Sequence, residues 1–181
     1  YPDIIWVAGM EYVPVTGTGF TGTEIEIQTT FPPEDVPAME KELKDITDPV
    51  IAELSGLTEY EKLREVYTWI INRSSYDLIS ADQSMYTLLT KGHGVCAGYA
   101  RAIQYLLREM GMECLYVYNE GHAWNVVKVD GEYCHVDATY GDPLPIQGED
   151  KLEYDYLGLT SAEIGRIVEH SLSGLNLELP D

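Results

Sequence analysis

Basic residues, cysteines and long apolar runs are all scarce in this sequence. The 181 residues include 11 lysines and arginines against 31 aspartates and glutamates, a formal net charge of −20. Nucleic acids and anionic membranes bind basic surfaces, so this balance argues against both as partners. No apolar run approaches the roughly 20 residues that a membrane helix needs, so membrane insertion is not expected. The acidic residues are spread along the chain, which is typical of a solvated surface.

The three cysteines are too few for a disulfide scaffold. Because their number is odd, at least one thiol is free or bonded to another chain. No Cys-x-x-Cys pair is present, and no metal site is predicted. Cys114 and Cys134 lie inside apolar, strand-like runs and are expected in the core. Cys96 differs, because glycines surround it.

Apolar periodicity predicts an α+β fold that begins with strands. Residues 1–32 alternate short apolar runs with glycines, and 24–28 show the period-two pattern of a half-buried strand. A helix is expected over about 34–54, with a kink or a division at Pro49, since proline has no N–H for the helical ladder. We interpret 1–32 as a β-rich extension and 33–181 as the main domain, most simply one compact unit.

Capping boxes and alternating runs define the rest of the main domain. Thr58 with Glu61 opens a second helix that ends near Asn72. Residues 73–92 are interpreted as mostly loop. The remaining predicted elements are a helix from about Cys96 to Gly111, strands at 113–118, 122–129 and 132–139, and a helix that a second capping box opens at Thr160 and that ends near Gly174.

The stretch 92–101 places Cys96 where a glycine-rich turn runs into a helix. From Ala100 onward, apolar residues recur at three- and four-residue steps, so Cys96 falls in the first turn of an amphipathic helix. Unpaired N–H groups and the positive end of the helix dipole lie there, and both would lower the pKa of the thiol. Gly94 and Gly98 would leave room for a substrate backbone. The alternative is an inert, packed cysteine.

The Asp-Gly pair at 130–131 predicts a tight hairpin, because a type I′ turn needs positive φ at both central positions. A two-residue turn fixes the register, which sets Asp137 opposite Trp124 and His122 opposite Thr139. His122 and Asp137 are then diagonal neighbours on one face, with Cα atoms roughly 7–8 Å apart. Their side chains can hydrogen-bond across that gap.

A thiol at a helix start, an imidazole and a carboxylate behind the imidazole are the parts of an activated nucleophile. In this interpretation His122 takes the proton of Cys96 and Asp137 orients the ring. The backbone N–H of Cys96 donates to an oxyanion. The structural alternatives are a satisfied core histidine at position 122 and an Asp137 that caps the loop at 140–141.

The other three histidines are weaker candidates. His135 shares the predicted face with Asp137 and is the rival base. We prefer His122, because the glycine and the tryptophan near it suit an open cleft. His93 should point away along the turn, and His170 is interpreted as a structural residue of the last helix.

Three motifs carry a family resemblance: GVCAGYA at 94–100, GHAWN at 121–125 and HVDAT at 135–139. In order and character they resemble the Cys, His and Asp blocks of the transglutaminase-like superfamily, within the broader papain-like group of thiol enzymes. The spacings of 26 and 15 residues between the three polar residues also fit. The resemblance covers about 60–143. It implies a papain-like core in which the nucleophile helix packs on an antiparallel sheet, with Cys96 as nucleophile, His122 as base and Asp137 as orienting carboxylate.

The family also places a side-chain oxyanion donor upstream of the cysteine. Gln83 is the first candidate and Tyr86 the second, and Trp124 is placed in the substrate cleft. One position departs from the animal cross-linking enzymes, which carry a tryptophan directly after the cysteine where this chain has Ala97. Nothing in the sequence resembles their calcium sites. The departure favours hydrolysis of peptide or amide bonds, the commoner expectation for microbial members.

We therefore expect a thiol-dependent acyl-transfer enzyme, most simply hydrolytic, that acts on a peptide or protein substrate without metal or organic cofactor. One alternative is transfer to an amine, as in a protein-glutamine transglutaminase. Another is a binding or structural module that has kept the fold without turnover. Residues 1–7 resemble the lead-in of some bacterial, often cell-surface, members. An extracellular or surface location in a bacterium is therefore expected, although no signal peptide is visible in this chain.

Overall fold

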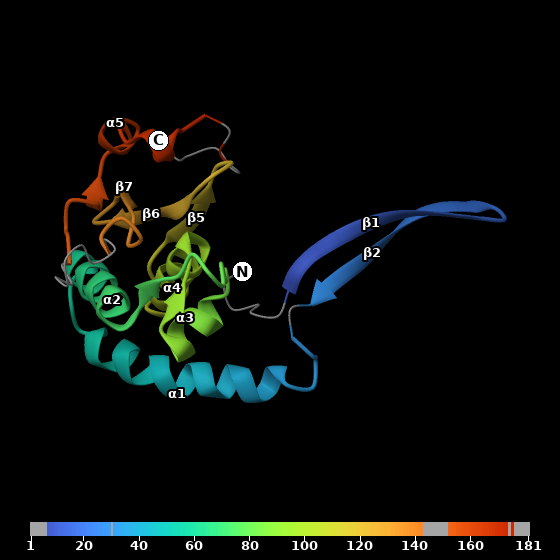
Figure 1. Ribbon diagram of the computed structural model, residues 1–181, viewed down its shortest axis with the longest axis horizontal. Coiled ribbons are helices and arrows are strands. Elements are labelled where there is room, and N and C mark those ends of the chain that lie inside the picture. The colour runs from blue at the N-terminus through green and yellow to red at the C-terminus, as the bar shows by residue number, and fades with distance from the viewer. Residues whose placement is uncertain (1–6, 30, 143–151, 174, 176–181) are drawn as a thin grey trace.

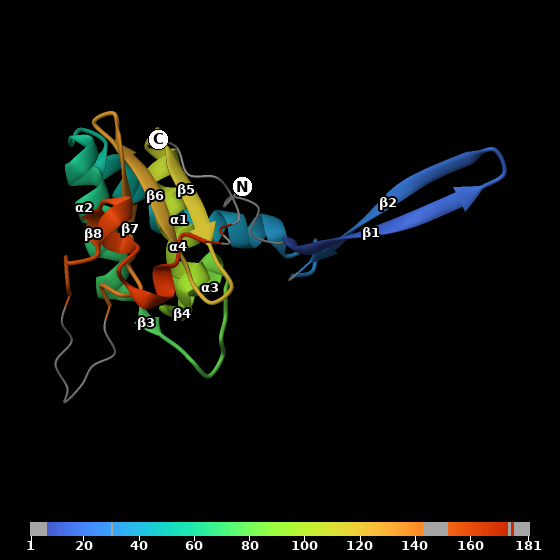
Figure 2. The same ribbon diagram turned by 90° about the horizontal axis from the view of Figure 1, so that it is seen from above.

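The computed structural model describes residues 7–29, 31–142, 152–173 and 175. Helices and a four-stranded antiparallel sheet form its body, and a two-stranded hairpin extends away from that body (Figures 1 and 2). The helices are α1 (Val36–Leu54), α2 (Glu59–Arg73), α3 (Met85–Lys91), α4 (Cys96–Glu109) and α5 (Ser161–Ile164), followed by a 3₁₀ turn η1 (Val168–His170). The strands are β1 (Val7–Gly17), β2 (Phe20–Thr29), β3 (Ser75–Tyr76), β4 (His93–Gly94), β5 (Cys114–Tyr118), β6 (Ala123–Val129), β7 (Glu132–Val136) and β8 (Leu157–Leu159). The α+β class is confirmed, and none of the described helices is long and apolar enough to span a membrane.

The hairpin of β1 and β2 corrects one expectation. Both strands are present and pair antiparallel, with Gly17 opposite Phe20. The prediction of a half-buried strand is wrong, since every side chain of β2 is exposed. Tyr12 and Phe20 keep 66% and 60% of their surface in solvent. Among the described elements, β1 and β2 pack mainly on each other, so the alternating side chains of β2 face water on both sides. Residues 4–6 of the predicted first strand lie outside the described residues.

Helix α1 runs without interruption through Pro49, so the predicted division at this proline is wrong. Proline removes one rung of the helical ladder, but Met39, Leu43 and Leu54 are buried against the body on both sides of it. That burial outweighs one lost hydrogen bond, since each buried aliphatic side chain contributes about 1.5–3 kcal/mol. Tertiary packing therefore overrides the local signal.

Helix α2 begins at the predicted capping box. The Thr58 hydroxyl accepts from the Glu61 N–H at 3.3 Å, and the Glu61 carboxylate accepts from the Thr58 N–H at 3.0 Å. The interpretation of 73–92 as mostly loop holds for about half of this segment, but it missed α3, which occupies seven residues of it. Ser84 caps that helix through the Tyr86 N–H at 3.2 Å. Its apolar residues Met85, Leu88 and Leu89 are buried, which explains why so short a segment is helical.

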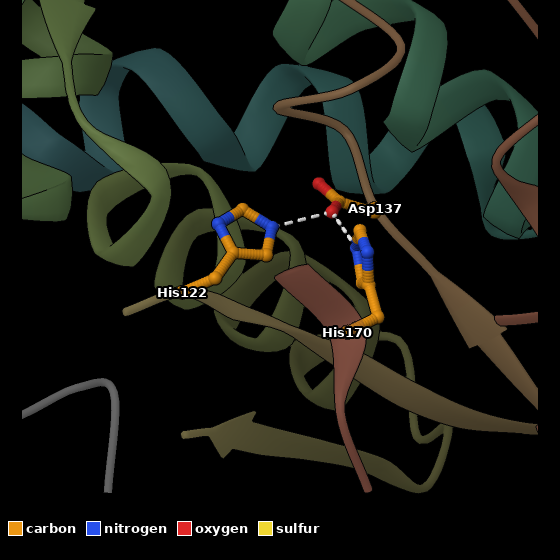
Figure 3. A group of neighbouring side chains, drawn as sticks. All are labelled: His122, Asp137 and His170. Atoms are coloured by element: carbon orange, nitrogen blue, oxygen red, sulfur yellow. Dashed lines mark hydrogen bonds and ion pairs between the residues drawn. The ribbon is translucent and has the colours of Figure 1, made fainter. Parts of the chain in front are cut away.

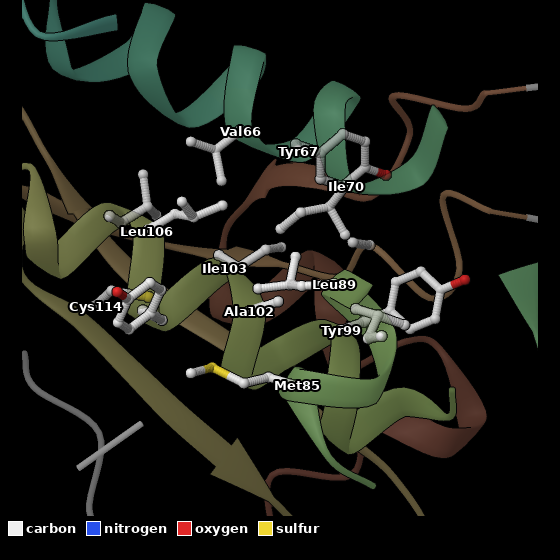
Figure 4. Packing of buried hydrophobic residues seen from close by; sticks show 14 of the residues in the cluster. Val66, Tyr67, Ile70, Met85, Leu89, Tyr99, Ala102, Ile103, Leu106 and Cys114 are labelled. Atoms are coloured by element: carbon white, nitrogen blue, oxygen red, sulfur yellow. The ribbon is translucent and has the colours of Figure 1, made fainter. Parts of the chain in front are cut away.

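The core lies between the helices and one face of the sheet (Figure 4). Helix α4 occupies its centre, between α1 and the strands β5 and β6 (Figure 1). The fully buried side chains include Leu63, Val66, Tyr67 and Ile70 of α2, Ile103, Leu106 and Leu107 of α4, and Val127 and Val136 of the sheet. This packing places the N-terminal end of α4 beside the start of β6.

The sheet has the order β5-β6-β7-β8, and the hairpin between β6 and β7 has the predicted register. Val129 pairs with Glu132 and Asn125 with Val136. Asp130 and Gly131 have φ values of 52° and 93°, as a type I′ turn requires. Strand β7 ends at Val136, three residues earlier than predicted, so Asp137 lies immediately beyond it.

The C-terminal region differs most from expectation. The capping box of Thr160 and Glu163 is present, but α5 ends at Ile164. The predicted helix to Gly174 is therefore wrong over most of its length, and Gly174 and the loop 143–151 lie outside the described residues. Ile164 is fully buried and anchors the short helix. After it the chain forms η1, which places His170 beside His122 and Asp137 (Figure 3).

Candidate active site

Cys96 is the first residue of α4, as predicted. The N-cap Val95 offers no side-chain cap, so backbone N–H groups of the first turn remain available to an anion. The residue is partly exposed, whereas most of the residues after it in this helix are buried. The thiol therefore lies at an accessible helix N-terminus, where the dipole favours the thiolate.

The space around the two nearby glycines is filled, which corrects the expectation that they admit a substrate. A Cβ at Gly98 would lie 3.3 Å from the Ser84 carbonyl oxygen. A Cβ at Gly94 would lie 3.2 Å from the Asp82 carbonyl oxygen. Both glycines therefore allow the segment before α3 to pack closely on the start of α4.

Tyr76 is a residue of this site that the sequence did not reveal. The parallel pairing of β3 with β4 sets Tyr76 opposite Gly94, two residues before Cys96. Burial raises the pKa of the Tyr76 hydroxyl, and the thiol and backbone N–H of Cys96 both interact with it. A phenol and a backbone N–H therefore converge beside the sulfur. No local pattern marks Tyr76, since its position depends on a two-residue strand contact.

His122 and Asp137 form the contact that the hairpin register predicts. His122 Nε2 lies 2.6 Å from Asp137 Oδ2, and both residues are buried (Figure 3). Asp137 Oδ1 accepts from the backbone N–H groups of Thr139 at 2.9 Å and Tyr140 at 3.2 Å. The carboxylate thus caps the following turn and orients the imidazole at once, so the two predicted roles coexist.

The electrostatics of Cys96, His122 and Asp137 favour an ion pair. Burial opposes the thiolate of Cys96, but the His122 ring and the N–H groups of Ala97 and Ala123 outweigh it and lower its pKa. Burial opposes a charged His122 as well, yet hydrogen bonds with Asp137 and Cys96 raise its pKa to about 9. Since Asp137 occupies Nε2, Nδ1 is the ring nitrogen available to the sulfur.

Of the other two cysteines, Cys114 is buried in the core as predicted, whereas Cys134 is only partly buried and packs against the core. All three cysteines are free. Burial raises the pKa of Cys114 and of Cys134, whereas that of Cys96 is lowered. Only Cys96 among the three is therefore prepared for nucleophilic chemistry near neutral pH.

His170 joins this group, and the structure places it in η1 rather than in the predicted last helix. Its Nε2 lies 2.5 Å from Asp137 Oδ2, and its side chain is fully buried (Figure 3). Two imidazoles thus donate to one carboxylate oxygen. Sequence pattern had no means of finding this contact, because 33 residues separate His170 from Asp137 and the intervening chain is irregular.

The rival base His135 is not in contact with Cys96. Its Nδ1 accepts from Trp124 Nε1 at 3.0 Å, and its Nε2 lies 3.1 Å from the Ser161 hydroxyl. Burial lowers the pKa of His135 to about 4, so the ring is neutral. Trp124 is 1% exposed and stacks on the ring of His122 with a centroid distance of 5.9 Å. Its expected place in the cleft is therefore wrong, and it supports His122 from the interior instead.

Tyr86, the second of the two oxyanion donors considered, and His93 have partners other than Cys96. Tyr86 donates to the Glu42 carboxylate of α1, so its hydroxyl is not directed at the sulfur. Gln83 is exposed, and its carbonyl oxygen accepts from Arg101 at 2.9 Å; its role as a donor stays a prediction. His93 lies 3.4 Å from Asp77.

A cavity of about 660 Å³ opens beside His122 and Tyr76, two of the side chains that interact with Cys96. Tyrosines and carboxylates dominate its walls. The lining residues are Tyr76, Gly121, His122, Thr139, Tyr140, Asp142, Glu153, Tyr156 and Glu169. Its volume suits a peptide side chain or a small molecule.

His122, Asp137 and His170 also have the composition of a metal site, with ligand atoms within 4.8 Å of one another. The distances from Asp137 Oδ2 to Nε2 of His122 and of His170, 2.6 and 2.5 Å, are those of hydrogen bonds. Two ligands on one tetrahedral zinc, each at about 2.0–2.1 Å, stand more than about 3 Å apart. The arrangement therefore fits hydrogen bonds better than joint metal ligation.

Comparisons with known proteins identify the family and the fold of this chain. Residues 48–138 match the family model of the transglutaminase-like superfamily. The chain is 27% identical to human kyphoscoliosis peptidase over 134 residues, covering 61% of this chain and 20% of that protein. The mouse kyphoscoliosis peptidase is 28% identical over 109 residues, covering 48% and 16%. The chain thus spans about a fifth or less of the curated relatives that it matches. A crystal structure described as a TGase superposes with a TM-score of 0.52 at 12% identity, over 82% of this chain and 48% of that chain, and shows the shared fold.

Proposed function

Because this chain belongs to the transglutaminase-like superfamily, we propose that it is a thiol-dependent hydrolase of peptide or amide bonds. Cys96 is its nucleophile, His122 its acid and base, and Asp137 its orienting carboxylate. The peptidase identity of the human and mouse relatives supports a peptide or protein as the substrate. No metal or organic cofactor takes part in this proposal.

The first half of the reaction acylates the enzyme. The Cys96 thiolate attacks the amide carbon, and the carbonyl π electrons move onto oxygen. In this proposal the Cys96 N–H and the Tyr76 hydroxyl, which interact with each other beside the sulfur, donate to this oxyanion. When the intermediate collapses, the C–N bond breaks and His122 gives its proton to the departing amine. A thioester and a neutral imidazole result.

The second half returns the enzyme to its starting state. Neutral His122 removes a proton from water, and the hydroxide attacks the thioester carbon. The C–S bond breaks, the carboxylic acid leaves, and the thiolate and imidazolium form again. Asp137 stays ionised throughout, because four hydrogen-bond donors surround it.

One observation carries this proposal: a partly exposed thiol whose pKa is lowered by a histidine that a buried aspartate holds at 2.6 Å. A binding module without turnover would not need an ionised carboxylate buried behind the histidine, since burying a charge costs free energy that its hydrogen bonds must offset.

The test compares the wild type with Cys96→Ala and Cys134→Ala on a fluorogenic peptide-amide library. We expect turnover and a mass adduct on Cys96 in the wild type and in Cys134→Ala, because position 134 lies outside the site. Cys96→Ala should lose both. Equal inactivity of all three proteins, together with equal resistance to a thiol-reactive probe at neutral pH, would favour the silent module instead.

The second candidate is transfer of the acyl group to a primary amine. It is favoured by the carboxylates of Asp142, Glu153 and Glu169, which line the cavity beside His122 and would attract a cationic amine. A glutamine peptide supplied with a labelled alkylamine separates the two outcomes. Incorporation of the label supports transfer, and release of free glutamate supports hydrolysis.

A further inference from the structure

The C-terminal turn η1 brings a second histidine to the site from outside residues 48–138, the part that matches the family. We propose that His170 is a positioning residue, whose Nε2–H completes the donors around Asp137 and keeps the carboxylate ionised and directed at His122. This inference rests on the proposed function. It assigns to the C-terminal segment a part in the reaction that the three sequence motifs do not contain.

The environment of Asp137 supports this role. The residue is 1% exposed, so no solvent surface compensates its charge. Oδ1 accepts two backbone N–H groups, and Oδ2 accepts one imidazole from His122 and one from His170. Burial pushes the pKa of Asp137 up, but the bonds from His122 and His170 outweigh burial and lower it. Loss of one imidazole therefore removes a quarter of the donors from a dehydrated carboxylate.

His170 also forms one wall around His122. Its ring lies edge-on to His122 at a centroid distance of 4.8 Å. Trp124 and Tyr140 pack on the same ring of His170 at 5.0 and 4.8 Å. Because Trp124 also stacks on His122, the three rings pack against one another, and this packing restricts rotation of the catalytic imidazole. The contacts that hold the base in place thus include the C-terminal segment.

Asn119 fastens the two histidine-bearing segments to each other. Its side-chain N–H groups donate to the carbonyl oxygens of Glu169 at 2.9 Å and Ser171 at 3.3 Å, on both sides of His170. Its Oδ1 accepts from the N–H groups of Gly121 and His122 at 3.0 Å each. One amide therefore sets the distance between the two imidazoles.

Burying the second nitrogen of His170, Nδ1, costs free energy. Nδ1 is buried and has no hydrogen-bond partner in the described part of the chain. A purely structural filler would be better served by an apolar ring, since an unpartnered buried polar atom costs about 1–3 kcal/mol. Donation of the Nε2–H to Asp137 explains why this position carries a histidine rather than an apolar ring.

The expected consequence is a change in the pH dependence of the thiolate. Without the His170 donor, Asp137 ionises only at a higher pH. At low pH it therefore stabilises the imidazolium form of His122 less well. Thiolate formation at Cys96 then requires a higher pH. The other titratable groups around Asp137 and His170 are Tyr67 of α2, Tyr76 of β3, His135 of β7, and Tyr140 and Tyr156.

The experiment measures the rate at which iodoacetamide alkylates Cys96, read from peptide mass as a function of pH. His170→Phe keeps a ring but removes the donor, and we expect its acid limb to move up by about one pH unit and amide turnover to fall roughly 10- to 100-fold. His170→Gln supplies a neutral N–H donor and should restore both to within about threefold. Asn119→Asp keeps the acceptor for His122 but turns an anion toward two carbonyl oxygens, and should behave like His170→Phe.

His135→Asn is the matched control, because it also alters a buried histidine of this sheet yet keeps an acceptor for Trp124. The pH profile of Cys96 alkylation in this variant should coincide with that of the wild type. If folded His170→Phe and Asn119→Asp show the same pH dependence of Cys96 alkylation as the wild type, the inference is overturned while the proposed function stays intact. If His170→Phe does not fold, Asn119→Asp decides by the same criterion. A wild-type Cys96 with the alkylation profile of an ordinary thiol would overturn the proposed function and this inference together.

Discussion

Asp137→Asn tests the central contact of the site by exchanging a single atom. Two backbone N–H groups, those of Thr139 and Tyr140, point at Oδ1. The amide oxygen of the variant must therefore stay at that position. Its NH₂ group then takes the place of Oδ2, 2.6 Å from His122 Nε2.

An NH₂ group donates and cannot accept, so His122 must present a bare Nε2 to it. The proton of the neutral ring then moves to Nδ1, the nitrogen that faces Cys96. In this tautomer the ring cannot take the proton of the thiol. The variant keeps the shape of the site and loses its proton acceptor.

The size of the effect follows from the His122 pKa of about 9 against an ordinary 6.5. This difference corresponds to about 3 kcal/mol at 1.36 kcal/mol per unit, of which the Cys96 interaction supplies a part. Adding the cost of the wrong tautomer, we expect amide turnover to fall by about 10²- to 10⁴-fold.

The assay follows alkylation of Cys96 and peptide-amide hydrolysis across about pH 5 to 10, with thermal unfolding as the check on folding. Asp155→Asn is the control for the loss of one negative charge, since residue 155 is exposed, and it should match the wild type. A folded Asp137→Asn variant whose rates stay within about threefold of the wild type would refute the reasoning.

Three further predictions concern pH, packing and the hairpin. Hydrolysis should fall on the acid side as the Cys96 thiolate is protonated, below the ordinary pKa of a thiol, and on the alkaline side near pH 9 as His122 loses its proton; an alkaline limb near 6.5 in the pH–rate profile would contradict the assignment of His122. Gly141→Ala should lower the free energy of unfolding by about 1–3 kcal/mol, because its Cβ would lie 1.6 Å from the Tyr67 hydroxyl oxygen; an unchanged urea midpoint would show that the backbone relaxes freely. Deletion of residues 1–29 should move the melting temperature of the body by no more than about 2 °C, since β1 and β2 pack on each other; a large fall would reveal support from the hairpin.

The parts of the fold that could be predicted from the sequence depend on interactions between residues only a few positions apart. The capping boxes at Thr58 and Thr160 involve residues three positions away. The register of β6 and β7 follows from the two residues of one turn. With Cys96 at a helix start, these local rules were enough to bring His122 and Asp137 together.

Other features could not be predicted, because contacts distant in sequence decide them. Helix α1 continues through Pro49, since its apolar side is buried in the body. Tyr76 reaches the thiol through a two-residue parallel pairing with β4. His170 reaches Asp137 from η1, 33 residues further along the chain. None of these leaves a periodic or spacing signal.

The sequence by itself was enough to select Cys96, His122 and Asp137 as the proposed nucleophile, base and carboxylate, because turn chemistry and helix capping act over a few residues and leave a recognisable pattern. Tertiary structure alone decided what surrounds them: the phenol of Tyr76, the stack of Trp124 on His122 and the second imidazole on Asp137. A buried carboxylate must collect its donors from whatever the fold brings near it, and segments far apart in the chain supply that environment.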